Sequence, residues 1–132
     1  MVVQMDKIKE LRPGAGIELM AVIVNMQPRR KLWKCFSCKQ QGLWKTKEEF
    51  QDICPICKAE ISKEKGKGIW IQDVTSALIE DDSGQVYLDF WNQDVDRFKI
   101  GDKIHLIDGY ARSNNSNGVN VSKGKFGSIM KE

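Results

Sequence analysis

QVYLDFW, residues 85–91, decides the fold predicted for this chain, because apolar residues alternate strictly with other residues along it. Successive side chains of an extended strand point to opposite faces, so a period of two predicts a half-buried β-strand. Val86, Leu88 and Phe90 form the face expected in the core. The opposite, exposed face is expected to carry Tyr87, Asp89 and Trp91.

Further strand signals lie on both sides of this segment. The five predicted strands are residues 16–26, 68–81, 85–91, 103–112 and 119–129, which are rich in β-branched and apolar residues and are separated by turn signals. Residues 92–101 read as a short helix or turn that buries Val95, Phe98 and Ile100, and residues 113–118 read as a polar turn. Five strands with one short helix between the third and the fourth is the order of an all-β, five-stranded OB-fold barrel.

All four cysteines lie between the first two of these strands. Cys35 and Cys38 form one Cys-x-x-Cys pair, and Cys54 and Cys57 form a second. This spacing is typical of a structural zinc site, in which four thiolates surround one ion and leave no open position. A rubredoxin-like iron site and disulfides are the alternatives. We therefore predict a zinc-ribbon module at residues 28–68, inserted into a barrel made of residues 1–27 and 69–132.

Four aromatic residues lie in or beside the cysteine loop and are expected to form its small core: Trp33, Phe36, Trp44 and Phe50. The loop is too short to build a larger core, so the metal would supply much of its stability.

Charge is distributed unevenly along the chain, although the net charge is only +3. Residues 28–68 carry 11 basic and 5 acidic side chains, residues 73–108 carry 3 basic and 9 acidic, and residues 109–132 carry 4 basic and 1 acidic. A solvated surface with chance segregation is one interpretation. The other is that the two basic segments meet around a polyanion.

Three stretches resemble a known family: LRPGAGIELMAVIV (11–24), DDSGQVYLDFWNQDVDRFKIGD (81–102) and GYARSNNSNGVNVSKGKFG (109–127). They resemble the archaeal single-stranded DNA-binding proteins with one OB fold and the domains of replication protein A. The inserted cysteine loop is similar to that of the zinc-bearing OB domain of the replication protein A large subunit. The resemblance covers nearly all of the predicted barrel.

This resemblance implies largely sequence-independent binding of single-stranded DNA in replication, repair or recombination. Trp91 and Tyr110 match base-stacking positions of the family, and Trp70 and Tyr87 are further stacking candidates. Asp89 is expected to repel phosphate and weaken binding. Candidate phosphate contacts are the basic residues of the insert and of the C-terminal segment: Arg29, Arg30, Lys31, Lys34, Arg112, Lys123 and Lys125.

Two other functions remain open on the sequence alone. The barrel could bind RNA, or it could be a protein-interaction subunit of a replication protein A-like complex. An enzyme is not expected, because no nucleophile–base set is visible, the metal site is closed, and His105 is the sole histidine. The chain lacks an apolar run of membrane-spanning length and a signal-peptide pattern, which predicts a cytoplasmic protein, or a nuclear one in a eukaryote, without a membrane partner.

Overall fold

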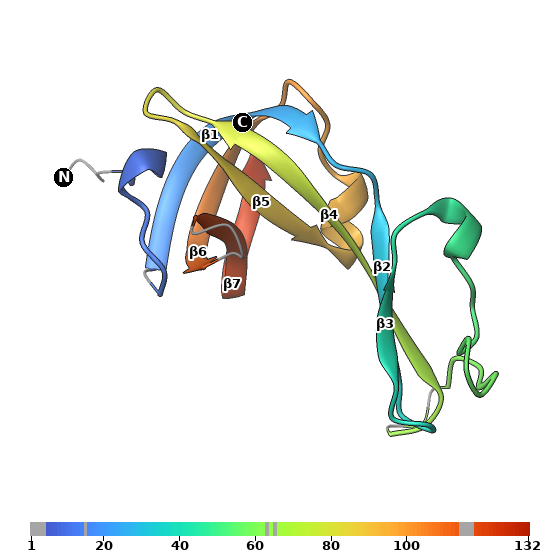
Figure 1. Cartoon of the computed structure of the whole chain (residues 1–132). Helices are drawn as coiled ribbons and strands as arrows, with labels where there is room; N and C mark the ends of the chain where they lie inside the picture. Colours follow the sequence, from blue (N-terminus) through green and yellow to red (C-terminus); the bar gives the residue numbers. More distant parts are fainter. Residues whose placement is uncertain (1–4, 15, 63, 65, 114–117) are drawn as a thin grey trace. The chain divides into compact units, whose positions relative to one another are not determined.

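The computed structural model describes residues 5–14, 16–62, 64, 66–113 and 118–132, so residues 114–117 of the predicted polar turn lie outside the described part (Figure 1). The chain forms two compact units. The barrel unit comprises Met1–Gln27, Ser76–Phe90 and Asp96–Glu132, and the hairpin unit comprises Pro28–Thr75 and Trp91–Val95. None of the helices in the described ranges is long and apolar enough to cross a membrane.

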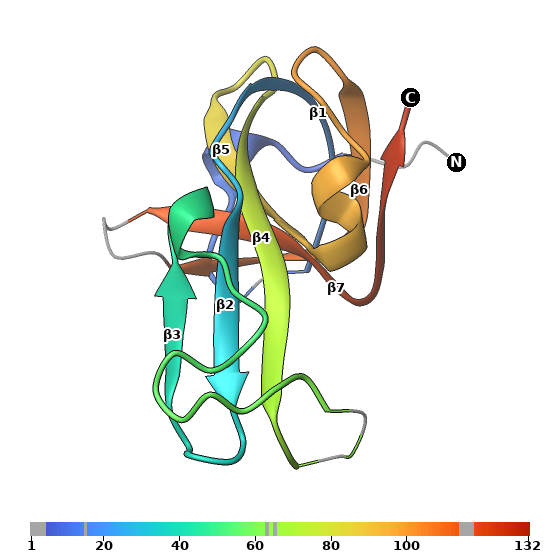
Figure 2. The ribbon, with the colours of Figure 1, turned by 90° about the vertical axis from the view of Figure 1, so that its right-hand side faces the viewer.

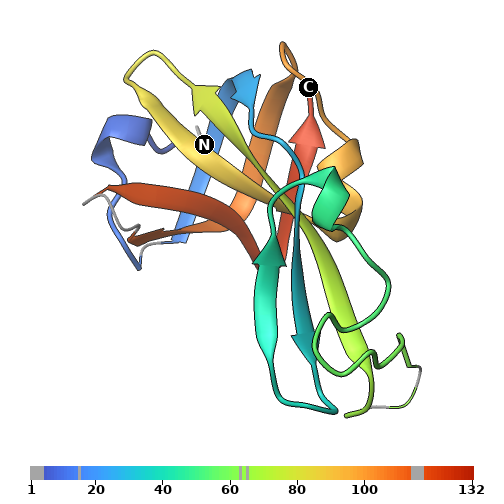
Figure 3. The same ribbon diagram turned by 45° about the vertical axis from the view of Figure 1, so that its right-hand side comes forward.

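The barrel unit is a closed β-barrel (Figure 3). Its strands are β1 (Gly16–Met26), the second half of β4 (Ile69–Glu80), β5 (Gln85–Trp91), β6 (Lys103–Ser113) and β7 (Val119–Lys131). β1 pairs antiparallel with β4 and with β6, β6 pairs antiparallel with β7, and β7 runs parallel to β5. Because β5 also neighbours β4, the ring closes in the strand order of an OB fold, as predicted.

In the described ranges, three short 3₁₀ helices accompany the strands: η1 (Ile8–Glu10), η2 (Lys47–Glu49) and η3 (Asn92–Asp96). The helix η3 is the predicted short helix between the third and fourth barrel strands. Val95 and Phe98 are buried as expected, but Ile100 is exposed, which corrects the prediction. The reason is a tight turn, in which the N–H of Asp102 donates to the carbonyl of Lys99 and leaves Ile100 at the tip.

The barrel core confirms the alternation along β5. Val86, Leu88 and Phe90 are buried, and Phe90 stacks on Phe98 with ring centroids 5.2 Å apart. Side chains of the other strands complete this core, namely Leu19, Ile23, Ile79, Ile104, Leu106, Val121 and Ile129.

A bulge at Asp108 changes which face of β6 each residue occupies. Ile104 and Leu106 point into the core before it, whereas the buried positions after it are Gly109 and Ala111. Asp108 is the extra residue: its φ is +51°, and the pairing with β7 shifts between Ile107 and Gly109. One extra residue reverses the inside–outside alternation. The bulge therefore places Tyr110 on the outer surface of the barrel.

Two glycines of β7 make room for this bulge. A Cβ atom on Gly127 would lie 2.5 Å from the carbonyl oxygen of Asp108, and one on Gly124 would lie 2.6 Å from the same oxygen. Residues with side chains cannot approach the bulge this closely.

The hairpin unit contains a three-stranded antiparallel sheet in the order β3–β2–β4 (Figure 2). Its strands are β2 (Arg30–Cys35), β3 (Gln41–Trp44) and the first half of β4. One face of this sheet packs under the cysteine loop, where Trp33 and Trp44 are buried and stack with centroids 6.0 Å apart. Phe50 packs against them, which confirms three members of the predicted small core; Phe36 is half-buried outside it.

Candidate metal centre and nucleic-acid interface

Two turns of similar construction bring the four cysteines together. The first follows β2 and holds Cys35 and Cys38, and the second holds Cys54 and Cys57. In each turn the N–H of the first cysteine donates to the carbonyl of the residue five positions later. Cys35 donates to Gln40, and Cys54 donates to Ala59. In each, the lysine that follows the second cysteine has a positive φ, +65° for Lys39 and +67° for Lys58. The lysine that follows each pair is therefore a sequence feature shared by the two turns, although lysine is not among the residues that favour a positive φ.

The sulfur positions fit a single ion. All four Sγ atoms lie within 4.8 Å of one another, and the Cys35–Cys57 and Cys38–Cys54 sulfur pairs are each 3.6 Å apart. Sulfurs at about 2.3 Å from a tetrahedral zinc ion would be about 3.8 Å apart. A disulfide requires an S–S distance of about 2.05 Å, and all four cysteines are free. The disulfide alternative is therefore wrong, and the four cysteines form a candidate metal site.

Electrostatics in the cluster also favours a cation. Burial raises the pKa of Cys54, but N–H groups of Cys57 and Ile56, both 3.4 Å from its Sγ, and the nearby thiols lower it to about 6. For Cys38, the N–H of Gln40 lowers the pKa, whereas burial and the other three thiols raise it to about 12. Four thiols this close cannot all ionise unless a positive charge balances them. A metal ion would supply that charge.

A second candidate site lies on the outer surface of the barrel unit. Tyr87 of β5 is paired with Asn120 of β7, and Asn120 is paired with Arg112 of β6, so the three residues form one row across three strands. Tyr110 lies two residues before Arg112 on the same exposed face of β6, and both tyrosines are exposed. The Gln27 amide Nε2 lies 3.4 Å from the Tyr87 hydroxyl oxygen. The register thus places two aromatic rings and a cation on one surface.

Asp89 is positioned differently from the sequence expectation. Its side chain is only 6% exposed: one carboxylate oxygen accepts from the Ser76 hydroxyl at 2.7 Å, and the other accepts from Arg112 Nη2 at 3.1 Å. The sequence predicted an exposed Asp89 carboxylate that repels phosphate. This expectation is wrong, because the carboxylate is buried and paired. Arg112 balances the charge of Asp89, while its own side chain remains 51% exposed.

Removing the Asp89 carboxylate is expected to destabilise the barrel. In Asp89→Ala the buried Ser76 hydroxyl loses this acceptor and Arg112 loses its ion pair, which should lower the free energy of unfolding by about 1–3 kcal/mol. Urea unfolding measures this. The control is Asp82→Ala, which breaks an exposed pair with Lys7 (2.8 Å) and should cost less than about 1 kcal/mol. Equal stability of the two variants would contradict the prediction.

The residues predicted to contact nucleic acid are divided between the two units. The barrel unit holds Tyr87, Tyr110, Arg112, Lys123 and Lys125, and the hairpin unit holds Trp70, Trp91, Arg29, Arg30, Lys31 and Lys34. Lys31 forms an ion pair with Asp73 at 3.7 Å. Lys34 lies over the ring of Phe36, and Lys125 lies over that of Phe126. His105 is half-buried between Glu18 and Glu132 and is not part of either site.

Solved structures similar to this chain have the same fold. No protein-family model matches the chain, and no curated protein sequence matches it significantly. Among solved structures, it is similar to the replication factor A-related protein from Methanobacterium thermoautotrophicum (TM-score 0.59, 15% identity, covering 98% of this chain and 91% of that one). It is also similar to the second OB-fold domain of replication protein A from Methanococcus maripaludis (TM-score 0.57, 20% identity, covering 97% and 94%).

The N-terminal domain of an archaeal MCM is a further structural neighbour (TM-score 0.52, 14% identity, covering 97% of this chain and 61% of that one). The predicted structural resemblance to replication protein A domains is thus confirmed. At these identities the likeness establishes the OB fold.

Proposed function

We propose that this chain binds single-stranded DNA, largely independently of sequence, as part of DNA replication, repair or recombination. The observation that carries the proposal is the row of Tyr87, Asn120 and Arg112 with Tyr110 beside it on the barrel surface. Exposed aromatic rings stack on bases of any identity, and cations beside them contact the phosphates. The OB-fold neighbours from replication proteins support the same role. A binding role also fits a closed metal site, which offers no position for a substrate.

We further propose that the cysteine cluster holds one structural zinc ion. In this interpretation residues 28–68 are a zinc-ribbon module inserted into a barrel of residues 1–27 and 69–132. In the insert the proposed phosphate contacts are Arg29, Arg30, Lys31 and Lys34, and in the barrel unit they are Arg112, Lys123 and Lys125. Trp91 and Trp70 would add stacking positions to those of Tyr87 and Tyr110. Other replication protein A-like subunits are the proposed protein partners.

The test is fluorescence anisotropy with labelled oligo-dT, matched duplex and oligo-rU at several salt concentrations. Oligo-dT is expected to bind more tightly than duplex, and two to four phosphate contacts predict a slope of about −1.4 to −2.8 in log affinity against log salt. Tyr87→Ala and Tyr110→Ala should each weaken binding by about 5- to 150-fold, because stacking is worth about 1–3 kcal/mol per base. Tyr87→Phe, which keeps the ring, is the matched control.

Each other outcome points to a different function. Tighter binding of oligo-rU would favour an RNA-binding protein. No binding of either strand at high micromolar concentration would reject the proposal and favour a protein-interaction subunit.

A further inference from the structure

The hairpin unit presents a regular array of side chains on the sheet face opposite its buried tryptophans. We call this surface the outer hairpin face, defined by Gln41, Lys34, Trp70, Leu43, Leu32 and Gln72. The pairing register arranges it in two rows across β3, β2 and β4. The first row is Gln41–Lys34–Trp70, and the second is Leu43–Leu32–Gln72.

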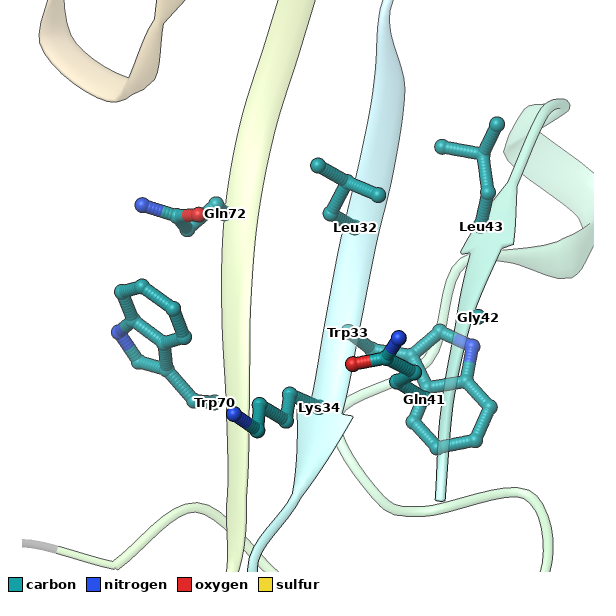
Figure 4. A pocket seen from close by; sticks show the side chains of 8 residues that line it. All are labelled: Leu32, Trp33, Lys34, Gln41, Gly42, Leu43, Trp70 and Gln72. Atoms are coloured by element: carbon teal, nitrogen blue, oxygen red, sulfur yellow. The ribbon is translucent and has the colours of Figure 1, made fainter. Parts of the chain in front are cut away.

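Trp70 is the unusual member of this array. This residue is 51% exposed, whereas Trp33 and Trp44 on the other face of the sheet are buried. Trp70 lines a hollow of about 380 Å³ together with the other residues of the outer hairpin face and with Trp33 and Gly42 (Figure 4). It also lines a second hollow of about 510 Å³ with Phe36, Ile61 and Ile71, and it is the one described residue that the two linings share. An exposed indole between two hollows is suited to a flat ring stacked against it.

The chemistry of the first hollow favours a nucleotide as its occupant. Among the described residues that line it, Lys34 is the only charged one, and Gln41 and Gln72 are the only ones with a side-chain amide. The described part of the lining thus carries a cation and no carboxylate, which complements a phosphate. A purely aliphatic groove would suit an apolar peptide segment better. The combination of an indole, a cation and two amides matches a base and its phosphate.

We propose that the outer hairpin face binds one nucleotide of single-stranded DNA and gives the chain a preference for adenine. The base stacks on Trp70, Lys34 contacts its phosphate, and the Gln72 amide reads the base edge. This inference rests on the proposed function, because it takes the same strand as ligand.

The spacing within the sheet supports these three roles. Gln72 follows Trp70 by two residues on the same face, which places its Cα about 7 Å further along the strand. That position is within reach of the edge of a base stacked on the indole. Lys34 is the direct cross-strand partner of Trp70, about 4.8 Å away in the pairing direction. A glutamine amide offers one donor and one acceptor side by side, which match N6 and N7 of adenine.

The first test compares dA6 with dT6 on the zinc-loaded chain of residues 1–132. Wild type is expected to bind dA6 more tightly by about fivefold or more, since one bidentate amide–base pair discriminates by about 5- to 150-fold. Gln72→Leu should abolish this preference and leave the affinity for dT6 unchanged. Gln51→Leu, an exposed glutamine of the hairpin unit outside this face, is the matched control. Equal affinity of wild type for the two oligonucleotides would overturn the adenine preference.

The second test locates binding on the surface. Trp70→Ala should weaken binding by about 5- to 150-fold, and Trp70→Phe should retain most of it. Amide spectra show whether each variant is folded, and titration with dA6 should shift the Trp70 indole N–H and the Gln72 side-chain amide. Wild-type affinity in Trp70→Ala would overturn the inference.

The pattern of shifts separates the two proposals. Shifts at Tyr87 and Tyr110 alone would support the barrel site and overturn the inference, leaving the outer hairpin face to a protein partner. Shifts at Trp70 and Gln72 alone would support the inference and reject the barrel site. No shifts in either place would reject both.

Discussion

Cys54→Ser is expected to unfold the hairpin unit while the barrel unit stays folded. Cys54 is fully buried, and its Sγ accepts two backbone N–H bonds that shape the second cysteine turn. The buried cluster around it contains just five described residues, two of which are cysteines. Structural zinc contributes about 10–16 kcal/mol of apparent binding free energy in small zinc modules. A core of this size cannot replace that contribution.

Three measurements check this outcome. Metal analysis should find one zinc ion per wild-type chain and a marked loss in Cys54→Ser. Near-UV circular dichroism should lose the signal of the stacked Trp33 and Trp44, and a chelator should produce the same change in wild type. Asp52→Ala, an exposed substitution close to Cys54 in sequence, should retain both metal and spectrum. An unchanged tryptophan signal in metal-free protein would show that the unit does not depend on the ion.

Phe90→Ala is expected to have the largest effect on the barrel unit. Phe90 is fully buried and stacks on Phe98, so truncation leaves a cavity that the surrounding strands cannot fill. Such substitutions cost about 3–5 kcal/mol, a large share of a total stability of about 5–15 kcal/mol. Urea unfolding followed by far-UV circular dichroism measures the loss.

Phe126→Ala is the matched control, because Phe126 is 86% exposed and its truncation should change stability by less than about 0.5 kcal/mol. Zinc content should be the same in both variants if the two units are stabilised separately. A loss below 1 kcal/mol in Phe90→Ala would mean that the barrel core is not packed as described.

Much of the fold could be predicted because its signals are local. The alternation along QVYLDFW predicted the buried set Val86, Leu88 and Phe90, and the two Cys-x-x-Cys pairs predicted the four-sulfur cluster. The aromatic core of the hairpin unit was also largely predicted, since Trp33 and Trp44 flank the first cysteine pair. Ile100 was misassigned because a turn, and not the helix period, determines its exposure.

The candidate sites were harder to predict than the fold, because they are formed by contacts between residues that are distant in sequence. Alternation alone would place Asp89 on the exposed face of β5 with Tyr87. The structure buries its carboxylate against Ser76 and Arg112, which are 13 and 23 residues away in sequence. A buried charge requires such partners, and no local pattern identifies them. The rows of the outer hairpin face likewise exist only once β2, β3 and β4 are paired in register.

The sequence by itself therefore determined the five barrel strands, their order in an OB barrel and the cysteine cluster, because periodicity and ligand spacing act over a few residues, whereas β2 and β3 of the insert were not predicted. Tertiary structure decided which side chains share a surface. Extending the alternation of β6 from Ile104 and Leu106 would turn Tyr110 into the core. The bulge at Asp108, accommodated by Gly124 and Gly127 of β7, turns it outward instead. That reversal depends on how closely two strands approach each other, which is a property of the folded barrel and not of either strand alone.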